Sequence, residues 1–295
     1  LTLYDYLLKK ANIFRVNCFF IQWIAAHQTD KNRRDFFQRL ANSENKEETS
    51  HFLASHSLLD FLKEEKDCKF TLQDLASQLL PLSPRLYSIA SSLKKHPGKI
   101  RLLVVPVEYK INGKTKKGVA THYLCNLSEQ GEKISGFIQK SRHFHLHEND
   151  KDIIMVGPGT GLAPFISFLE ERETASADGK NWLFFGERKQ ASDFYMEDYL
   201  LSLEKKDFLK LSLAFSRDQE KKIYVQDKIL EEGKEIYQWL KSDAVFYICG
   251  NTKMAIDVEK ALSAVFQIHG NMTLEEIHDF FKQLKKERRF LKDVY

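Results

Sequence analysis

The chain has 295 residues, 43% of them hydrophobic, which is enough for two or three cooperative units with a substantial core. Its 45 basic and 41 acidic residues are spread over the whole length, so the charge distribution argues against a nucleic-acid-binding protein. The four cysteines form no Cys-x-x-Cys pair, which argues against a disulfide framework or a zinc site and favours a reducing cytoplasm: Cys18, Cys68, Cys125 and Cys249.

Residues 1–80 place apolar side chains three and four positions apart, which predicts an all-α segment. Helices are expected over 3–13, 19–27, 33–55, 58–64 and 72–80, with breaks or caps at Asp60, Thr71 and the polar run 42–50. The longest apolar stretch near the start, "CFFIQWIAA", is far shorter than the about 20 residues that span a membrane. The first residue is not methionine, which suggests that the chain is a fragment or a processed product.

Residues 81–150 change to alternating apolar and polar positions, which predicts an antiparallel β segment. Strands are expected over 85–92, 99–110 and 132–140, with turns at "HPG" and "NGK". In the first strand, alternation directs Arg85 and Tyr87 to one face and Ser88 to the other. A cation, an aromatic ring and a hydroxyl suit a flavin, although a half-buried strand with a polar outer face has the same composition. Further on, "KKGVATHYL" predicts a helix whose first N–H groups suit a pyrophosphate.

Residues 151–295 alternate apolar strands with amphipathic helices, which predicts a parallel sheet with helices on both faces. Strands are expected over 153–156, 181–186, 209–215, 244–250 and 288–295, and helices over 163–173, 193–206, 225–242, 253–266 and 274–287. The last strand alternates Phe290, Lys292 and Val294, so it is expected to be an edge strand that holds Tyr295 in place.

The stretch "IIMVGPGTGLAPF" puts three glycines, Gly157, Gly159 and Gly161, between a predicted strand and a predicted helix. Glycines let a backbone approach a pyrophosphate closely, and a helix N-terminus offers free N–H groups to it. A tight strand-to-helix turn without a ligand is the alternative. No Lys-Ser/Thr pair follows, so a nucleotide-hydrolysing P-loop is not expected.

The stretch "AFSRDQEKKIYVQ" follows the third predicted strand of this sheet and begins with Ser216 and Arg217. Open α/β sheets bind ligands at the carboxyl ends of their strands. A hydroxyl, a guanidinium, the ammonium of Lys222 and the ring of Tyr224 suit a phosphorylated ribose with its adenine, which favours NADP over NAD. A solvated, charged loop is the alternative.

Two further patterns have both a functional and a structural interpretation. Cys249 follows a predicted strand and is either a site residue or a buried thiol that packs as a small hydrophobe. The stretch "HFHLH" puts His143, His145 and His147 on one face of an extended segment, but a metal site usually needs further converging ligands, so none is expected.

Seven motifs occur in order along nearly the whole chain: "RLYSIASS", "GVATHYL", "GPGTGLAPF", "NWLFFGERK", "AFSRDQEKKIYVQ", "YICGNTKMAIDVEKAL" and "RRFLKDVY". Together they resemble the C-terminal, FAD- and NADPH-binding half of the diflavin reductase family, most closely its sulfite reductase branch, with the cytochrome P450 reductases as a sister branch. The resemblance implies a ferredoxin-NADP reductase-like fold of class α/β + β. It comprises a helical connecting domain over 1–80, an incomplete antiparallel FAD barrel over 81–150 and a parallel-sheet NADP(H) domain over 151–295.

The same resemblance implies roles for individual residues. FAD would be contacted by Arg85, Leu86, Tyr87, Ser88, Tyr109, Gly118, Val119, Ala120 and Thr121. NADPH would be contacted by Gly157, Gly159, Thr160, Gly161, Ser216, Arg217, Lys222, Tyr224, Gln226 and Asp257. The hydride-transfer site would contain Ser88, Cys249 and Asp293, and the ring of Tyr295 would cover the flavin until nicotinamide displaces it.

The resemblance also implies an activity: NADPH reduces FAD, and electrons pass on to an FMN domain or to a haem-containing sulfite reductase subunit. The sequence contains neither a flavodoxin-like FMN domain nor the first strands of the family's FAD barrel. A second hypothesis is therefore a truncated or remnant module that binds NADP without catalytic FAD. FMN is expected only with a separate or upstream domain.

Overall fold

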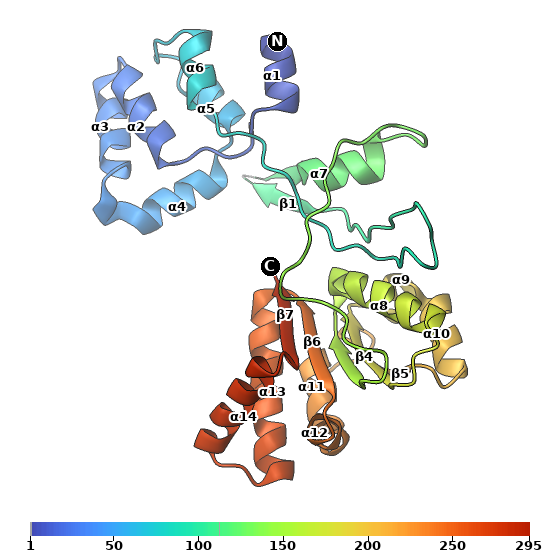
Figure 1. Cartoon of the computed structure of the whole chain (residues 1–295). Coiled ribbons are helices and arrows are strands. Elements are labelled where there is room, and N and C mark those ends of the chain that lie inside the picture. Colours follow the sequence, from blue (N-terminus) through green and yellow to red (C-terminus); the bar gives the residue numbers. More distant parts are fainter. Residues whose placement is uncertain (1, 112) are drawn as a thin grey trace. The chain divides into compact units, whose positions relative to one another are not determined.

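The structure is a computed structural model that describes residues 2–111 and 113–295. Two compact units divide the chain (Figure 1). We call the first the helical unit; it consists of the residues up to Leu86 together with Pro106–Ser128. We call the second the sheet unit; it consists of Tyr87–Val105 and Glu129–Tyr295. Across the described residues, none of the helices combines the length and the apolar character that crossing a membrane requires.

The helical unit confirms the predicted all-α start of the chain. Its helices are α1 (Leu3–Lys9), α2 (Cys18–His27), α3 (Lys31–Leu40), the 3-10 turn η1 (Ser43–Asn45), α4 (Lys46–Ser55), α5 (Leu58–Glu64) and α6 (Leu72–Gln78). The single helix expected over 33–55 is divided into α3 and α4. The interruption, between Leu40 and Lys46, overlaps the start of the polar run 42–50 that was expected to break it. Thr71 caps α6 and Asp60 completes the capping box of α5, as their residue types favour.

The core of the helical unit is built from aromatic and branched side chains on four helices, α2, α3, α5 and α6, including Phe20, Ile21, Phe37 and Phe61. A hairpin in the same unit pairs β1 (Glu108–Ile111) with β2 (Lys114–Lys117) in antiparallel register. Gly113, at φ +74°, provides the left-handed residue of its turn, whereas Asn112 of the expected "NGK" turn lies outside the described residues. The helix α7 (Val119–His122) follows and continues as a π turn, η2 (Tyr123–Leu127).

The strands expected over 85–92 and 132–140 are not formed, and of 99–110 only the end lies in β1. The described residues of 81–105 form two isolated antiparallel bridges, one between Ile89 and Leu102 and one between Pro81 and Ala11. Alternation predicts an extended backbone, but a strand also needs a partner for its N–H and C=O groups. Residues 132–140 form no strand, and apolar side chains of this segment stay in solvent: Phe137 is 64% exposed and Ile138 is 72% exposed.

The sheet unit is a five-stranded parallel sheet in the order β5-β4-β3-β6-β7. The strands are β3 (Ile153–Val156), β4 (Asn181–Glu187), β5 (Lys210–Phe215), β6 (Val245–Gly250) and β7 (Phe290–Val294). Its helices are the 3-10 turn η3 (Gly159–Leu162), α8 (Ala163–Thr174), α9 (Gln190–Asp193), α10 (Glu197–Lys205), α11 (Val225–Glu231), α12 (Gly233–Lys241), α13 (Thr252–Gly270) and α14 (Leu274–Lys286). The strands follow the predicted ranges closely, and β7 is the expected edge strand.

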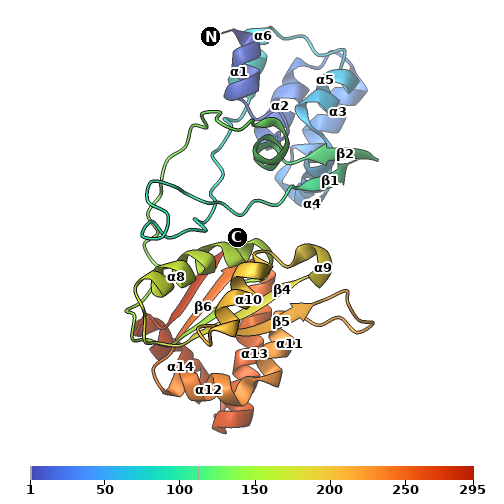
Figure 2. The same ribbon diagram turned by 90° about the vertical axis from the view of Figure 1, so that its right-hand side faces the viewer.

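Both faces of this sheet are covered, which explains why its three central strands, β3, β4 and β6, are mainly apolar. Helices α11, α12, α13 and α14 cover one face and α8 and α10 cover the other (Figure 2). The first face packs Ile154, Trp182 and Phe246 against its helices, and the second packs Met155 and Leu183. Two predicted helices are shorter than expected. The helix over 193–206 begins only at Glu197, because Met196 is left-handed at φ +59°, and the helix over 225–242 divides at Glu232 into α11 and α12.

Candidate nucleotide and flavin site

The glycine-rich turn lies at the carboxyl end of the central strand, β3. From β3 the chain passes to β4 and β5 on one side of it and then returns to β6 and β7 on the other side. The strand order therefore reverses between β3 and β6. Ligands of open α/β sheets bind at such a point, beyond the carboxyl ends of the strands. The turn Gly157–Gly161 follows β3 directly and leads into η3 and α8.

Each glycine of this turn has a steric reason. A Cβ at Gly157 would lie 2.6 Å from the ring of Phe165, and a Cβ at Gly161 would lie 2.1 Å from the carbonyl oxygen of Cys249. Gly159 has φ +58°, which a glycine adopts without strain. Close packing therefore explains Gly157 and Gly161 even without a ligand, while the position of the turn at the N-terminal end of α8 gives it N–H groups suited to a pyrophosphate.

The predicted phosphate-binding residues follow β5. The backbone N–H of Ser216 donates to the carbonyl of Glu187 (2.9 Å), and that of Arg217 donates to the carbonyl of Arg188 (2.8 Å). The β4–β5 ladder thus continues past the ends of both strands, and it brings Arg188 beside Arg217. Both arginines are exposed. Arg188 was not predicted as a site residue, although its place directly after the strand "NWLFFGE" was a usable signal.

The other predicted NADP residues lie on two further elements of the sheet unit. Lys222 and Tyr224 are exposed in the loop that leads to α11, and Gln226 is in its first turn. The N–H of Tyr224 donates to the Asp227 carboxylate (2.8 Å), which fixes the start of the helix next to this loop. Asp257 lies on α13, where its carboxylate is 3.4 Å from the ammonium of Lys260.

Two of the predicted hydride-transfer residues are neighbours in the sheet. Cys249 of β6 and Asp293 of β7 are register partners, so their side chains project from the same face. Cys249 is 1% exposed, and burial, with the nearby Asp293 charge, raises the pKa of its thiol to about 12. The thiol is therefore neutral at physiological pH and can donate a hydrogen bond, but it is no thiolate nucleophile.

Tyr295 is held at the carboxyl edge of the same sheet. Its N–H donates to the carbonyl of Gly250 (3.0 Å), and the N–H of Thr252 donates to the carbonyl oxygen of Tyr295 (3.2 Å). Its phenol oxygen lies 2.7 Å from the hydroxyl of Thr160, inside the glycine-rich turn. The expectation that this residue is held in place is confirmed, and the residue, 64% exposed, remains at the surface.

The predicted FAD residues are divided between the two units. Arg85 and Leu86 are exposed in the helical unit, whereas Tyr87 and Ser88 are half-buried in the sheet unit. In the helical unit, Tyr109 lies on β1, and Gly118, Val119, Ala120 and Thr121 form the start of α7.

The start of α7 is shaped by close packing. The Gly118 N–H donates to the carbonyl of Val107 (2.7 Å), and the Val107 N–H donates to the hydroxyl of Thr121 (3.1 Å). A Cβ at Gly118 would lie 2.7 Å from the oxygen of that hydroxyl. The predicted helix start is therefore confirmed, and a glycine is required there for steric reasons alone.

Of the histidines of "HFHLH", His147 has a structural role. His147 Nδ1 lies 2.6 Å from the phenol oxygen of Tyr247, which in turn donates to the carbonyl of His145 (2.8 Å). Burial lowers the pKa of His147, while the nearby Glu148 charge partly opposes this. Nowhere in 2–111 or 113–295 do three or more His, Cys, Asp or Glu side chains gather in a way that could hold a metal ion.

Comparison with known families agrees with this geometry. Residues 2–123 match the family model described as FAD binding domain, and residues 155–260 match the one described as oxidoreductase NAD-binding domain. The chain therefore contains one region similar to an FAD binding domain and another similar to an oxidoreductase NAD-binding domain. This confirms the predicted fold class and the two predicted kinds of cofactor.

Individual relatives are more specific. The chain is 41% identical, over 85% of its length, to the sulfite reductase [NADPH] flavoprotein alpha-component of Vibrio vulnificus, of which it covers 41%. It is 40% identical, over 90% of its length, to the protein of the same name from Buchnera aphidicola, of which it covers 44%. The predicted resemblance is thereby confirmed, and the chain spans about two fifths of the length of these curated relatives.

Proposed function

We propose that this chain is an NADPH-dependent flavoprotein oxidoreductase module that acts within a sulfite reductase. The observation that carries the proposal is the juxtaposition, at the carboxyl edge of the parallel sheet, of the Cys249–Asp293 pair, the glycine-rich turn and Tyr295. When bound, NADPH and FAD supply the redox chemistry by hydride transfer, so the protein needs only to position them and to provide polarity.

Each part of the sheet unit has a task in this proposal. The glycine-rich turn receives the pyrophosphate of NADPH, and Ser216, Arg217, Lys222, Tyr224 and Gln226 bind the phosphorylated adenosine, with Arg188 as an additional cation and Asp257 as a further contact. The exposed, basic loop before α11 supports the assignment of the phosphorylated adenosine, and the strand-to-helix turn after β3 supports that of the pyrophosphate.

The flavin side is assigned in the same way. Arg85 and the start of α7 would hold the FAD phosphates, Tyr87 would stack on the ring system, and Leu86 and Tyr109 would line it. Ser88, Cys249 and Asp293 are the polar groups proposed to face the reacting atoms, with Cys249 as a neutral donor. Tyr295 would lie over the flavin until nicotinamide takes its place.

The wider assignments are also proposals. They comprise a connecting domain over 1–80, an FAD domain over 81–150, an NADP(H) domain over 151–295, a cytoplasmic location, and an FMN domain or a haem-containing sulfite reductase subunit as electron acceptor. The location is supported by the absence of a disulfide among the four cysteines, all of which are described.

The direct test is to purify the protein with added FAD, remove unbound flavin and add NADPH without oxygen. Retention of FAD, bleaching of its absorbance by NADPH and ferricyanide reduction are the expected results. NADH at equal concentration serves as the control and should act more slowly. The proposal is wrong if the flavin is retained but not bleached, or if it is not retained at all.

A second function, NADP binding without FAD, is favoured by one observation: the segments 81–105 and 129–150 contain no paired strand beyond single bridges among their described residues. Calorimetric binding of NADP+ by protein that does not retain FAD would support this alternative.

A further inference from the structure

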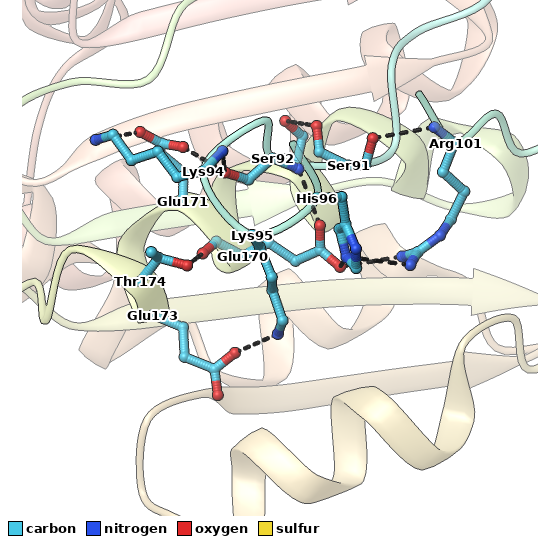
Figure 3. Close-up of polar contacts among 11 residues, drawn as sticks. Ser91, Ser92, Lys94, Lys95, His96, Arg101, Glu170, Glu171, Glu173 and Thr174 are labelled. Atoms are coloured by element: carbon cyan, nitrogen blue, oxygen red, sulfur yellow. Dashed lines mark hydrogen bonds and ion pairs between the residues drawn. The ribbon is translucent and has the colours of Figure 1, made fainter. Parts of the chain in front are cut away.

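A ladder of polar contacts joins the segment after Ser88 to helix α8, both within the sheet unit (Figure 3). The hydroxyl of Ser167 donates to the carbonyl of Ser91 (3.1 Å), and the N–H of Ser92 donates to a carboxylate oxygen of Glu170 (2.9 Å). Two ion pairs then extend the ladder: Lys94 with Glu171 (2.6 Å) and Lys95 with Glu173 (2.6 Å).

The order of these contacts fixes a direction. As the segment proceeds from Ser91 to Lys95, its partners proceed from Ser167 to Glu173, so segment and helix run the same way. Followed backwards, the segment leads towards the N-terminal end of α8, where the glycine-rich turn lies. The three residues from Ser91 back to Ser88 span up to about 10 Å, and the four from Ser167 back to Ala163 rise about 6 Å, so Ser88 is within reach of that end.

Glu170 is the central member of this ladder. Its side chain is 3% exposed, and its carboxylate contacts Ser92, the guanidinium of Arg101 (3.0 Å) and the His96 ring nitrogen Nε2 (3.1 Å). A buried carboxylate is stable only when its hydrogen-bonding positions are filled, and here three groups from one loop fill them.

The same carboxylate holds both sides of that loop. The N–H of Ala90 donates to the carbonyl of Arg101 (2.8 Å), the N–H of Arg101 donates to the hydroxyl of Ser91 (3.0 Å), and Ile89 bridges to Leu102. Glu170 therefore fixes the outgoing side through Ser92 and the returning side through Arg101. The residue that leads into this clamped loop is Ser88.

We propose that Glu170 is a positioning residue for hydride transfer: through Ser92 and Arg101 it sets where Ser88 lies relative to the glycine-rich turn at the start of α8. The inference rests on the proposed function, because it takes Ser88 to face the reacting atoms of the flavin. Glu170 itself contacts no cofactor in this proposal. Displacing a positioned group by about 1 Å can slow a reaction by about 100-fold.

The test compares Glu170→Gln with Glu173→Gln in the FAD-loaded protein. The first substitution keeps the side-chain shape and an acceptor for Ser92 but loses the charge that pairs with Arg101. Glu173 lies on the same helix and forms only partly exposed ion pairs with Lys95 and Lys206, so its loss should matter little. Arg101→Met, which removes the partner and leaves the carboxylate in place, is the second variant if Glu170→Gln fails to fold.

Two measurements separate positioning from general loosening. In stopped-flow reduction by NADPH, Glu170→Gln should slow flavin reduction about 10- to 100-fold with NADPH affinity within about twofold, and the isotope effect from 4-deuterated NADPH should persist or grow. Glu173→Gln should stay within about threefold of the unaltered protein. A loss confined to NADPH affinity, or equal losses in both variants, would overturn the proposal.

The second measurement does not depend on activity. Amide hydrogen exchange over residues 87–92 should be at least about tenfold faster in Glu170→Gln than in the unaltered protein, and unchanged in Glu173→Gln. If the unaltered protein retains FAD but NADPH never reduces it, the proposed function fails, and exchange alone decides whether Glu170 holds this segment. Unchanged exchange in Glu170→Gln would reject the positioning role in either case.

Discussion

Replacing Arg217 by Ala should separate the two nicotinamide coenzymes. Arg217 is exposed, and the bond that fixes its turn is made by its backbone N–H to the carbonyl of Arg188, which alanine preserves. The free energy of unfolding should therefore change by less than about 0.5 kcal/mol. A charge-assisted hydrogen bond to a phosphate contributes about 1.5–3 kcal/mol, which corresponds to a 10- to 150-fold weaker binding of NADPH.

NADH has no 2′-phosphate, so its affinity should change less than about twofold. Because Arg188 remains beside the altered position, the loss for NADPH should fall towards the lower end of the range. The measurement is the dissociation constant and KM for both coenzymes at fixed ionic strength. Lys221→Ala is the matched control, since it removes one positive charge from the same exposed loop without removing a predicted phosphate contact. Equal losses for NADPH and NADH, or an equal effect of Lys221→Ala, would refute the reasoning.

Four further predictions concern the same unit. Gly161→Ala should lower the melting temperature and weaken NADP+ binding at least about tenfold, because its Cβ would lie 2.1 Å from the Cys249 carbonyl oxygen and overpacking costs about 1–3 kcal/mol; an unchanged melting curve would contradict this. Tyr295→Ala should tighten NADP+ binding severalfold with the melting temperature preserved, since its backbone bonds remain; unchanged affinity and turnover would argue against a covering role. Iodoacetamide at neutral pH should modify exposed Cys18 at least about 100-fold faster than buried Cys249, as mass spectrometry of timed samples can show, and similar rates would rule out a protected thiol. Burial opposes ionisation of Glu170, but hydrogen bonds from Ser92, His96 and Arg101 outweigh it and lower the pKa of this carboxyl below its ordinary 4.5. The stability that the ionised carboxylate contributes is therefore present above pH 4.5 and is lost as the pH falls through the folded-state pKa. In urea unfolding from pH 7 to 3, Glu170→Gln should lose less free energy of unfolding than the unaltered protein, and identical pH profiles would count against this.

Local patterns in the sequence determined most of the sheet unit. Its three central strands, β3, β4 and β6, are buried on both faces, so each is a short, mainly apolar run between polar turns, and such a run is recognisable without knowledge of its neighbours. The same holds for the glycine-rich turn, for the caps of α5 and α6 and for the final strand. The ordered motifs also indicated the resemblance to the diflavin reductases before any geometry was known.

Tertiary structure decided what depends on partners distant in the chain. Alternation in 81–150 predicted more strands than form, because pairing is a property of two segments and periodicity describes only one. Arg188 became a candidate only when the β4–β5 ladder brought it beside Arg217. The contact of Thr160 with Tyr295 joins residues 135 positions apart, and the bond of Ser92 to Glu170 joins residues 78 apart.

These contacts could not be predicted from the sequence for one shared physical reason. A glutamate on an amphipathic helix is expected to face solvent, and nothing local distinguishes Glu170, which is buried, from Glu173, which is partly exposed. Only the folding of the 88–102 loop onto α8 supplies the N–H and guanidinium donors that let a carboxylate stay charged without water. The sequence by itself thus determined the local elements and the resemblance to known reductases, and the packing of distant segments determined which polar side chains contact one another.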